Sequence, residues 1–188
     1  MKHLIIYAHP NPGSLNAHLK NTLVDYLAFG NHEIEVRDLY ELKFNPILSS
    51  EDIAGQLQGM VSDDVKTEQQ WISWAERITF IYPIWWTGLP AIMKGYIERV
   101  FSYGYAYSYT NGVQQGLLKG KQAVIINTHG KSATEYQLNG VGEALTLTAD
   151  KGLYGYCGLE ILKHFMFDRA DRPAAESIAN WEAQITAV

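Results

Sequence analysis

Cysteine is nearly absent from this sequence of 188 residues, which contains only Cys157. No disulfide can form within the chain, so nothing indicates secretion, and we expect the thiol to be a small buried apolar group. No stretch approaches the roughly 18 apolar residues of a membrane span, and the apolar run at residues 4–8 is too short for the core of a signal peptide. We therefore expect a soluble, cytoplasmic protein.

Basic residues are also few, with 15 Lys and Arg against 20 Asp and Glu and a formal net charge of −5. A surface with this charge does not attract nucleic acid through bulk electrostatics. The six histidines are scattered, and no pair has the close spacing of a zinc site, so we expect no metal centre. The chain also lacks a Walker loop, a Gly-x-Gly-x-x-Gly fingerprint and a Gly-x-Ser-x-Gly elbow, which argues against nucleotide hydrolysis and serine hydrolase chemistry.

Five segments have the apolar content of β-strands, and segments of helical periodicity separate them. The expected strands are residues 4–8, 33–39, 77–82, 123–128 and 159–167. Most are wholly apolar, which is typical of strands buried on both faces of a parallel sheet, whereas residues 33–39 alternate like an edge strand. The first expected helix runs from Ser14 to residue 30, the second begins near residue 50, and the third runs from Asp63 or Asp64 to residue 75. Further helices are expected over 91–101 and in part of 137–156, and Asp171 is expected to cap a last helix with Pro173 in its first turn.

This alternation predicts an α/β fold, a doubly wound five-stranded parallel sheet in the flavodoxin order 2-1-3-4-5, as a single domain over residues 1–188. In such a sheet, ligands bind at the carboxyl ends of the strands, where the strand order reverses. Three loops rich in unusual residues follow strands near that point, at residues 9–14, 83–90 and 128–136. We expect these loops to converge on one ligand.

The first loop leads from a buried strand into a helix N-terminus, where free N–H groups and the helix dipole favour an anion. Ser14 and Asn16 add side-chain donors, which suits the phosphate of a mononucleotide or dinucleotide. The alternative is an ordinary turn in which Ser14 only caps the helix and His9 is structural.

The second loop carries Trp85 and Trp86 between two prolines. Exposing a large apolar side chain costs on the order of 1.5–3 kcal/mol, so the pair predicts a flat aromatic ligand such as a flavin ring, or a loop folded back on its own core. In the third loop, small residues around Gly130 allow backbone N–H groups to approach the edge of such a ring.

Tyrosines at 103, 105, 107 and 109 alternate with small or polar residues. They form either a surface hairpin with partly exposed side chains or one wall of an aromatic pocket.

Four stretches of the chain resemble the NAD(P)H:quinone oxidoreductases of the DT-diaphorase type and the shorter bacterial proteins related to potassium-efflux ancillary proteins and modulators of drug activity. The matching stretches are residues 4–10 with 14–16, residues 38–40 with 44–46, residues 83–101 apart from a few positions, and residues 156–158. The third is the longest and most specific, because it contains Pro83-Ile84-Trp85-Trp86 and continues through Gly88-Leu89-Pro90 to Glu98-Arg99-Val100-Phe101.

This resemblance implies a flavin-dependent enzyme that reduces quinones, and also azo or nitro aromatics, by two-electron hydride transfer in a ping-pong mechanism. It implies a homodimer that binds FAD, with FMN as the other choice, and uses NADPH or NADH as co-substrate. Two other functions stay open: a flavin-binding regulatory subunit of a potassium-efflux-type membrane system, and a one-electron carrier.

The resemblance also implies roles for individual residues. The cofactor contacts would be His9, Ser14, Leu15, Asn16, Pro83, Ile84, Trp85, Trp86, Thr128, His129, Gly130 and Tyr136. The acceptor would meet Trp86, Tyr107, Tyr109 and Tyr156, the tyrosines reaching across the dimer. Well-studied members pair the residue at Tyr136 with a histidine that this chain lacks, so the catalytic proton role falls on Tyr136 alone or on His129, which replaces a glycine and otherwise fills space.

Overall fold

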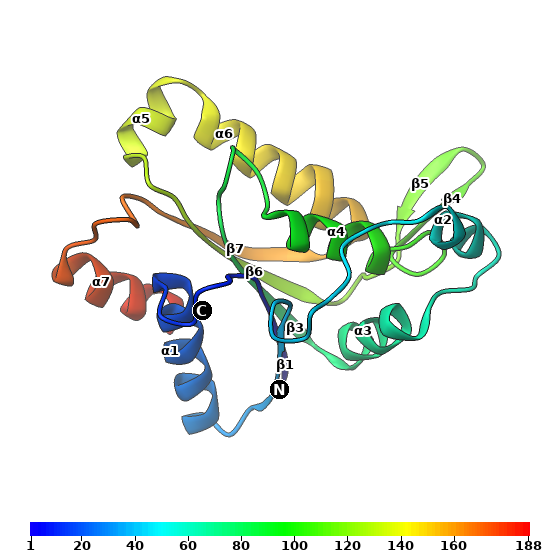
Figure 1. The fold of residues 1–188 in the computed structure, drawn as a ribbon, viewed down its shortest axis with the longest axis horizontal. Coiled ribbons are helices and arrows are strands. Elements are labelled where there is room, and N and C mark those ends of the chain that lie inside the picture. The colour runs from blue at the N-terminus through cyan, green and yellow to red at the C-terminus, as the bar shows by residue number, and fades with distance from the viewer.

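The computed structural model describes residues 1–188, which form a parallel sheet with helices on both faces (Figure 1). The five strands are β1 (Lys2–Tyr7), β2 (Glu33–Asp38), β3 (Arg77–Pro83), β6 (Gln122–Thr128) and β7 (Glu160–Phe167). They lie in the order β2-β1-β3-β6-β7, and all neighbouring pairs are parallel. The fold and strand order predicted from the sequence are therefore confirmed.

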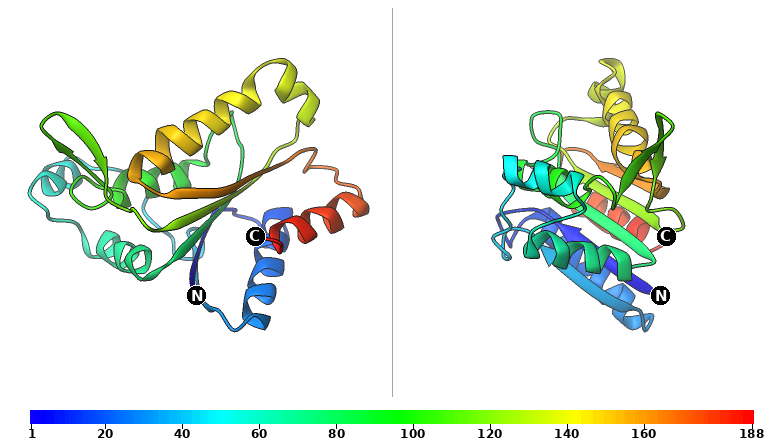
Figure 2. Two further views of the ribbon diagram at one scale, coloured as in Figure 1. Left: turned by 180° about the vertical axis from the view of Figure 1, so that it is seen from behind. Right: turned by 90° about the vertical axis from the view of Figure 1, so that its right-hand side faces the viewer.

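Two apolar clusters fix which helices cover which face of the sheet. Helices α1 (Leu15–Phe29) and α7 (Ala175–Ile185) pack on one face, against alternate residues of β1, β3, β6 and β7. Helices α3 (Asp63–Trp74) and α4 (Ala91–Val100) cover the other face together with a π-helix (Leu147–Tyr154) that continues α6 (Val141–Thr146). Figure 2 shows both layers from behind and from the side. The two-sided burial explains why the inner strands β1, β3 and β6 are mostly apolar.

Shorter elements complete the chain. They are α2 (Ser50–Leu57), α5 (Ala133–Leu138), a 3₁₀ turn (Gly155–Cys157), and a hairpin of β4 (Tyr107–Thr110) and β5 (Val113–Gly116) that projects away from the central sheet (Figure 1). The single thiol, on Cys157, is buried as predicted, and burial raises its pKa to about 12. None of the helices is both long enough and apolar enough to cross a membrane.

The prediction that Asp171 caps the last helix was wrong. That helix begins at Ala175, with Ala174 at its N-cap, beyond Pro173. The segment before it is held by the third loop instead, because Ala170 N–H donates to His129 O at 2.9 Å and Ala133 N–H donates to the Asp168 carboxylate at 2.9 Å. These bonds delay the start of the helix by several residues.

Candidate functional site

The three loops predicted to converge line one pocket of about 310 Å³ at the carboxyl edge of the sheet. It lies where the strand order reverses, beside the ends of β1 and β3. Ten of the predicted cofactor contacts line this pocket: His9, Ser14, Leu15, Asn16, Pro83, Ile84, Trp85, Thr128, His129 and Gly130. Hydrogen bonds join the loops directly, from Ile84 N–H to Thr128 O at 2.8 Å and from Asn16 Nδ2 to Thr128 Oγ1 at 2.7 Å.

The start of α1 supplies an anion cradle to this pocket. Ser14 is the N-cap, and its hydroxyl accepts the Ala17 N–H at 3.1 Å. The N–H groups of the first two helical residues, Leu15 and Asn16, have no acceptor within the chain. Asn16 is 3% exposed, and its Oδ1 is buried without a partner while its amide nitrogen binds Thr128. An unpaired buried polar atom costs about 1–3 kcal/mol, so this cradle is built to receive a polar ligand group.

His9 closes one side of the pocket. Its ring lies 5.6 Å from that of Trp85, and its Nδ1 lies 3.1 Å from Asn11 N and 3.2 Å from Asn11 O. Burial lowers the pKa of His9 below 6.5, although its contact with Asn11 raises it. Burial therefore favours a neutral ring at neutral pH.

The tryptophan loop is a two-residue turn. Trp85 and Gly88 exchange both backbone hydrogen bonds at 3.1 Å, and the residues between them, Trp86 and Thr87, have φ of 50° and 55°. This turn normally takes Asn-Gly, because positive φ is costly for residues with larger side chains. Trp86 is fully exposed and does not line the pocket, and Trp85 is 41% exposed. The loop is therefore not folded back on the core, and its strained turn leaves the Trp86 indole exposed to solvent.

The third loop offers fewer free backbone donors than expected. The His129 N–H donates to Phe167 O at 2.9 Å, so the sheet uses it, while the Gly130 N–H has no acceptor within the chain. The donor available to a ligand edge at this turn is therefore that of Gly130.

His129 and Tyr136 form a stacked pair, with ring centroids 4.3 Å apart and an angle of 10° between the rings. His129 is 4% exposed and also lines the pocket, whereas Tyr136 lies behind it in a smaller cavity of about 260 Å³. Burial lowers the pKa of His129 and raises that of Tyr136. Both rings are neutral at neutral pH, so the stack forms an uncharged wall.

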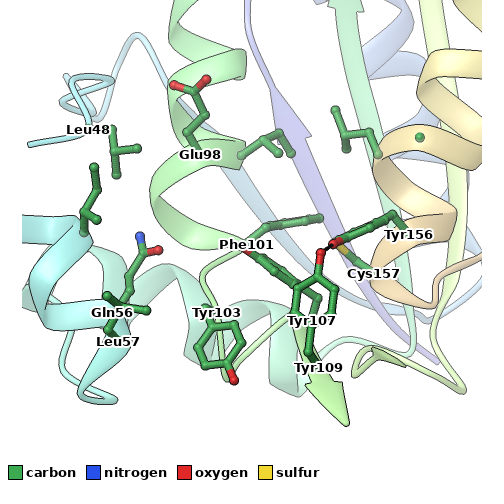
Figure 3. Close-up of a pocket in the computed structure, with 14 residues that line it drawn as sticks. Leu48, Gln56, Leu57, Glu98, Phe101, Tyr103, Tyr107, Tyr109, Tyr156 and Cys157 are labelled. Atoms are coloured by element: carbon green, nitrogen blue, oxygen red, sulfur yellow. Dashed lines mark hydrogen bonds between the residues drawn. The ribbon is translucent and has the colours of Figure 1, made fainter. Parts of the chain in front are cut away.

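The predicted acceptor tyrosines gather elsewhere in the chain. Tyr107, Tyr109 and Tyr156 line an open, mostly apolar pocket of about 650 Å³ (Figure 3). The hydroxyls of Tyr109 and Tyr156 lie 2.7 Å apart. Tyr105 lies outside the hairpin, and its hydroxyl donates to Gln69 O at 2.6 Å. Both interpretations of the alternating tyrosines therefore apply in part: Tyr107 and Tyr109 lie in the hairpin, and these two and Tyr103 line a pocket.

Two groups of residues were missed from the sequence. Ala170 and Asp171 line the first pocket, because the segment before α7 folds over it. A further pocket of about 440 Å³ lies between the tryptophan loop and the π-helix, with Tyr82 and Asn127 among the residues that line it. Asn127 is a polar amide that directly follows the apolar run 123–126 of β6, a signal that could have marked it.

The sheet order, the anion cradle and the aromatic loop together define a flavodoxin-like α/β protein with a ligand site at its switch point. Comparison with known proteins agrees: the family described as "Flavodoxin-like fold" matches residues 1–188. An uncharacterized NAD(P)H oxidoreductase of Haemophilus influenzae is 38% identical, over 100% of this chain and 98% of its own length. NAD(P)H dehydrogenase [quinone] 1 of Cavia porcellus is 34% identical, over 85% of this chain and 66% of its own length.

Among solved structures, a putative quinone reductase from Klebsiella pneumoniae superposes with a TM-score of 0.91 and 32% identity, over 100% of this chain and 83% of that one. The chain belongs to the NAD(P)H:quinone oxidoreductase family with a flavodoxin-like fold.

Proposed function

We propose that this chain is a flavin-dependent NAD(P)H:quinone oxidoreductase, built as one flavin-binding domain over residues 1–188. The observation that carries the proposal is the pocket where three distant loops meet, with free N–H groups at one end and an indole and a stacked imidazole along its walls. The names and activities of the relatives support the same reaction class.

The residues of the pocket fit a flavin. The Leu15 and Asn16 N–H groups and the Ser14 hydroxyl would hold a phosphate, with the orphaned Asn16 Oδ1 left for a hydroxyl of the ribityl chain. Trp85 would flank the ring, and the Gly130 N–H would donate to its polar edge. This donor matters because charge develops at that edge during reduction.

FAD is the form that we favour over FMN. A second pocket of about 660 Å³ adjoins the cradle and shares Ser14, Leu15 and Ala170 with it. It runs between α1 and α7, past His18 and Glu182, where a second phosphate and a nucleoside have room. FMN would leave this surface bare.

The bound flavin would supply the two-electron chemistry, taking a hydride from NADPH or NADH and passing it to a quinone in ping-pong order. The chain itself would hold the ring in this pocket, with the neutral His129 in its wall and the neutral Tyr136 stacked behind His129. Neither side chain is charged at neutral pH, so the proton that the acceptor needs would come through a neutral group, either the His129 imidazole in the pocket wall or the Tyr136 hydroxyl behind it.

A homodimer would complete the acceptor site. Tyr107, Tyr109 and Tyr156 lie in a separate pocket within one chain, and that pocket is bordered by the exposed side chains of Ile53 and Leu57, 51% and 71% exposed. We propose that a second copy covers this apolar face and brings its tyrosines to the open face of the flavin. Flat acceptors, meaning quinones and azo or nitro aromatics, suit such a slot.

Isolation of the protein tests the proposal most directly. The purified protein should be yellow, denaturation should release a flavin that mass spectrometry identifies as FAD, and the protein should oxidise NADPH when menadione is present. A colourless protein that takes up neither FAD nor FMN would rule the proposal out. Bound flavin without turnover would instead favour a regulatory binding subunit.

Replacing Trp86 with alanine should lower the rate of menadione reduction several-fold while leaving stability within about 0.5 kcal/mol, because the indole is fully exposed and buries nothing within the chain. The matched control is Phe29→Ala on α1, which removes another aromatic side chain that is 90% exposed. Steady-state rates and thermal unfolding of both variants provide the check. Equal rates in the two variants would exclude a role for Trp86 in acceptor reduction.

A further inference from the structure

A buried histidine outside the pocket links three parts of the site by hydrogen bonds. His164 lies on β7, and its side chain is 5% exposed. Its Nδ1 is 2.8 Å from the Asp150 carboxylate on the π-helix, and its Nε2 is 2.8 Å from the Asn127 side-chain oxygen on β6. The Asn127 amide nitrogen in turn donates to Tyr82 O on β3 at 3.2 Å. One chain of bonds thus crosses the sheet from the helix layer to the central strand.

Two members of this series of hydrogen bonds, Asn127 and Tyr82, lie at the bases of two of the ligand loops. Tyr82 immediately precedes Pro83, where the tryptophan loop starts, and Asn127 immediately precedes Thr128 of the third loop. Tyr82 and Asn127 also line the 440 Å³ pocket beside the tryptophan loop, with the π-helix residues Ala149 and Gly152 on its other side. A shift of His164 would therefore move both loop bases and the helical wall of that pocket.

The hydrogen-bond pattern shows why histidine is needed here. The Tyr82 carbonyl orients the Asn127 amide so that its oxygen faces His164, and the carboxylate of Asp150 faces the other ring nitrogen. Two acceptors flank the ring, so a neutral imidazole donates to one of them, and both contacts are satisfied when the pair holds one further proton.

The surroundings of the pair oppose a free charge. Burial lowers the pKa of His164, and the nearby carboxylate of Asp150 partly restores it. The other groups that face the pair are the phenols of Tyr82 and Tyr154, which lie 3.3 Å apart and whose pKa values burial raises. No second cation is present among these groups, so the position of His164 rests on its contacts with Asp150 and Asn127. The π-helix that carries Asp150 is itself a rare element found mostly at functional sites.

We propose that His164 is a positioning residue, which sets the spacing between the tryptophan loop, the third loop and the π-helix through Asp150 and Asn127. Its consequence for flavin binding rests on the proposed function, whereas its control of the loops does not. The residue touches no ligand and acts only through the groups that it holds.

The test compares His164→Leu with His3→Leu. His3 is also a buried strand histidine, 2% exposed, with one 2.8 Å bond to Thr79 and a pKa lowered to about 3 by burial, but it lies at the opposite end of the sheet. Amide hydrogen exchange of His164→Leu should be roughly tenfold faster in residues 83–90 and 128–132 and unchanged in α7. His3→Leu should leave all three segments as in the unmodified protein.

A second pair of variants keeps the test decisive if His164→Leu does not fold. In Asp150→Asn, the new amide can donate to Nδ1 while a neutral ring donates through Nε2, so exchange in both loops should match the unmodified protein. Asp150→Leu removes that partner and should speed exchange in the same segments. Equal exchange in the two Asp150 variants would overturn the proposal, as would faster loop exchange in His3→Leu.

Titration of each protein with FAD separates the two proposals. We expect His164→Leu to bind FAD roughly tenfold more weakly than His3→Leu does. If the unmodified protein binds no FAD but the exchange results hold, the proposed function fails and the positioning role stands. If FAD binds and loop exchange does not respond to His164→Leu, the positioning role fails alone.

Discussion

Replacing Arg99 with methionine should lower the free energy of unfolding by about 2 kcal/mol, because it leaves the mostly buried Asp52 carboxylate and the half-exposed Asp64 carboxylate without their partner. Arg99 is 4% exposed at the end of α4. Its guanidinium lies 2.6 Å from Asp64 and 3.3 Å from Asp52, and donates to Asn45 O at 2.8 Å and Ser62 Oγ at 3.0 Å. It therefore ties α2, α3 and the loop before them to the helix that follows the tryptophan loop.

The dependence of this loss on pH follows from the two carboxyl groups. Burial raises the pKa of Asp52 and of Asp64, but hydrogen bonds from Arg99 and from nearby backbone and serine groups outweigh burial and hold both below 3.8. A depressed pKa contributes stability that is complete above the unfolded value and is lost as the pH falls through the folded value. The difference between the unmodified protein and Arg99→Met should therefore be largest at neutral pH and shrink below about pH 4.

Urea unfolding at neutral and acid pH measures this difference. The control is Arg172→Met, since Arg172 is 89% exposed and its pair with Asp171 should contribute less than about 1 kcal/mol. A loss for Arg99→Met no larger than that of the control would contradict the role of Arg99 as the buried link between these segments.

The strand order could be predicted because each strand carries its own signal. Residues 4–8 are apolar throughout and residues 77–82 and 123–128 are mostly apolar, which is typical of two-sided burial in a parallel sheet, and the alternation of residues 33–39 marks an edge. The start of α7 could not be predicted in the same way. The Asp171-Pro173 pattern is a valid helix start, but tertiary hydrogen bonds to the third loop override it.

The convergence of the three loops also follows from topology alone, since carboxyl ends of neighbouring parallel strands meet at one edge. The backbone conformation of the loops could not be predicted from the sequence. Positive φ at Trp86 and the use of the His129 N–H by Phe167 both depend on how the loops meet. The link through His164 joins residues 82, 127, 150 and 164, and no spacing within the chain reveals such a contact.

Replacing Asn16 with aspartate should weaken FMN binding about 100-fold, because it places a carboxylate in a cradle built for a phosphate. Asn16 is 3% exposed and lines the pocket beside the free N–H groups at the start of α1. The two side chains have the same shape, and the Thr128 hydroxyl that accepts from the Asn16 amide can donate to a carboxylate instead, so the main difference is one of charge. Burial raises the pKa of such a carboxyl group, so the loss of affinity should grow as the pH rises and the group ionises.

Riboflavin separates charge repulsion from general damage to the pocket, since it has the same ring as FMN and no phosphate. Asn16→Asp should bind riboflavin within a few-fold of the unmodified protein, and fluorescence titration measures both ligands. Asn139→Asp, an exposed amide at the end of α5, controls for the added negative charge and should change neither affinity. If Asn16→Asp lost riboflavin and FMN alike, the start of α1 would not be the phosphate cradle, since only a repelled phosphate makes the two ligands differ.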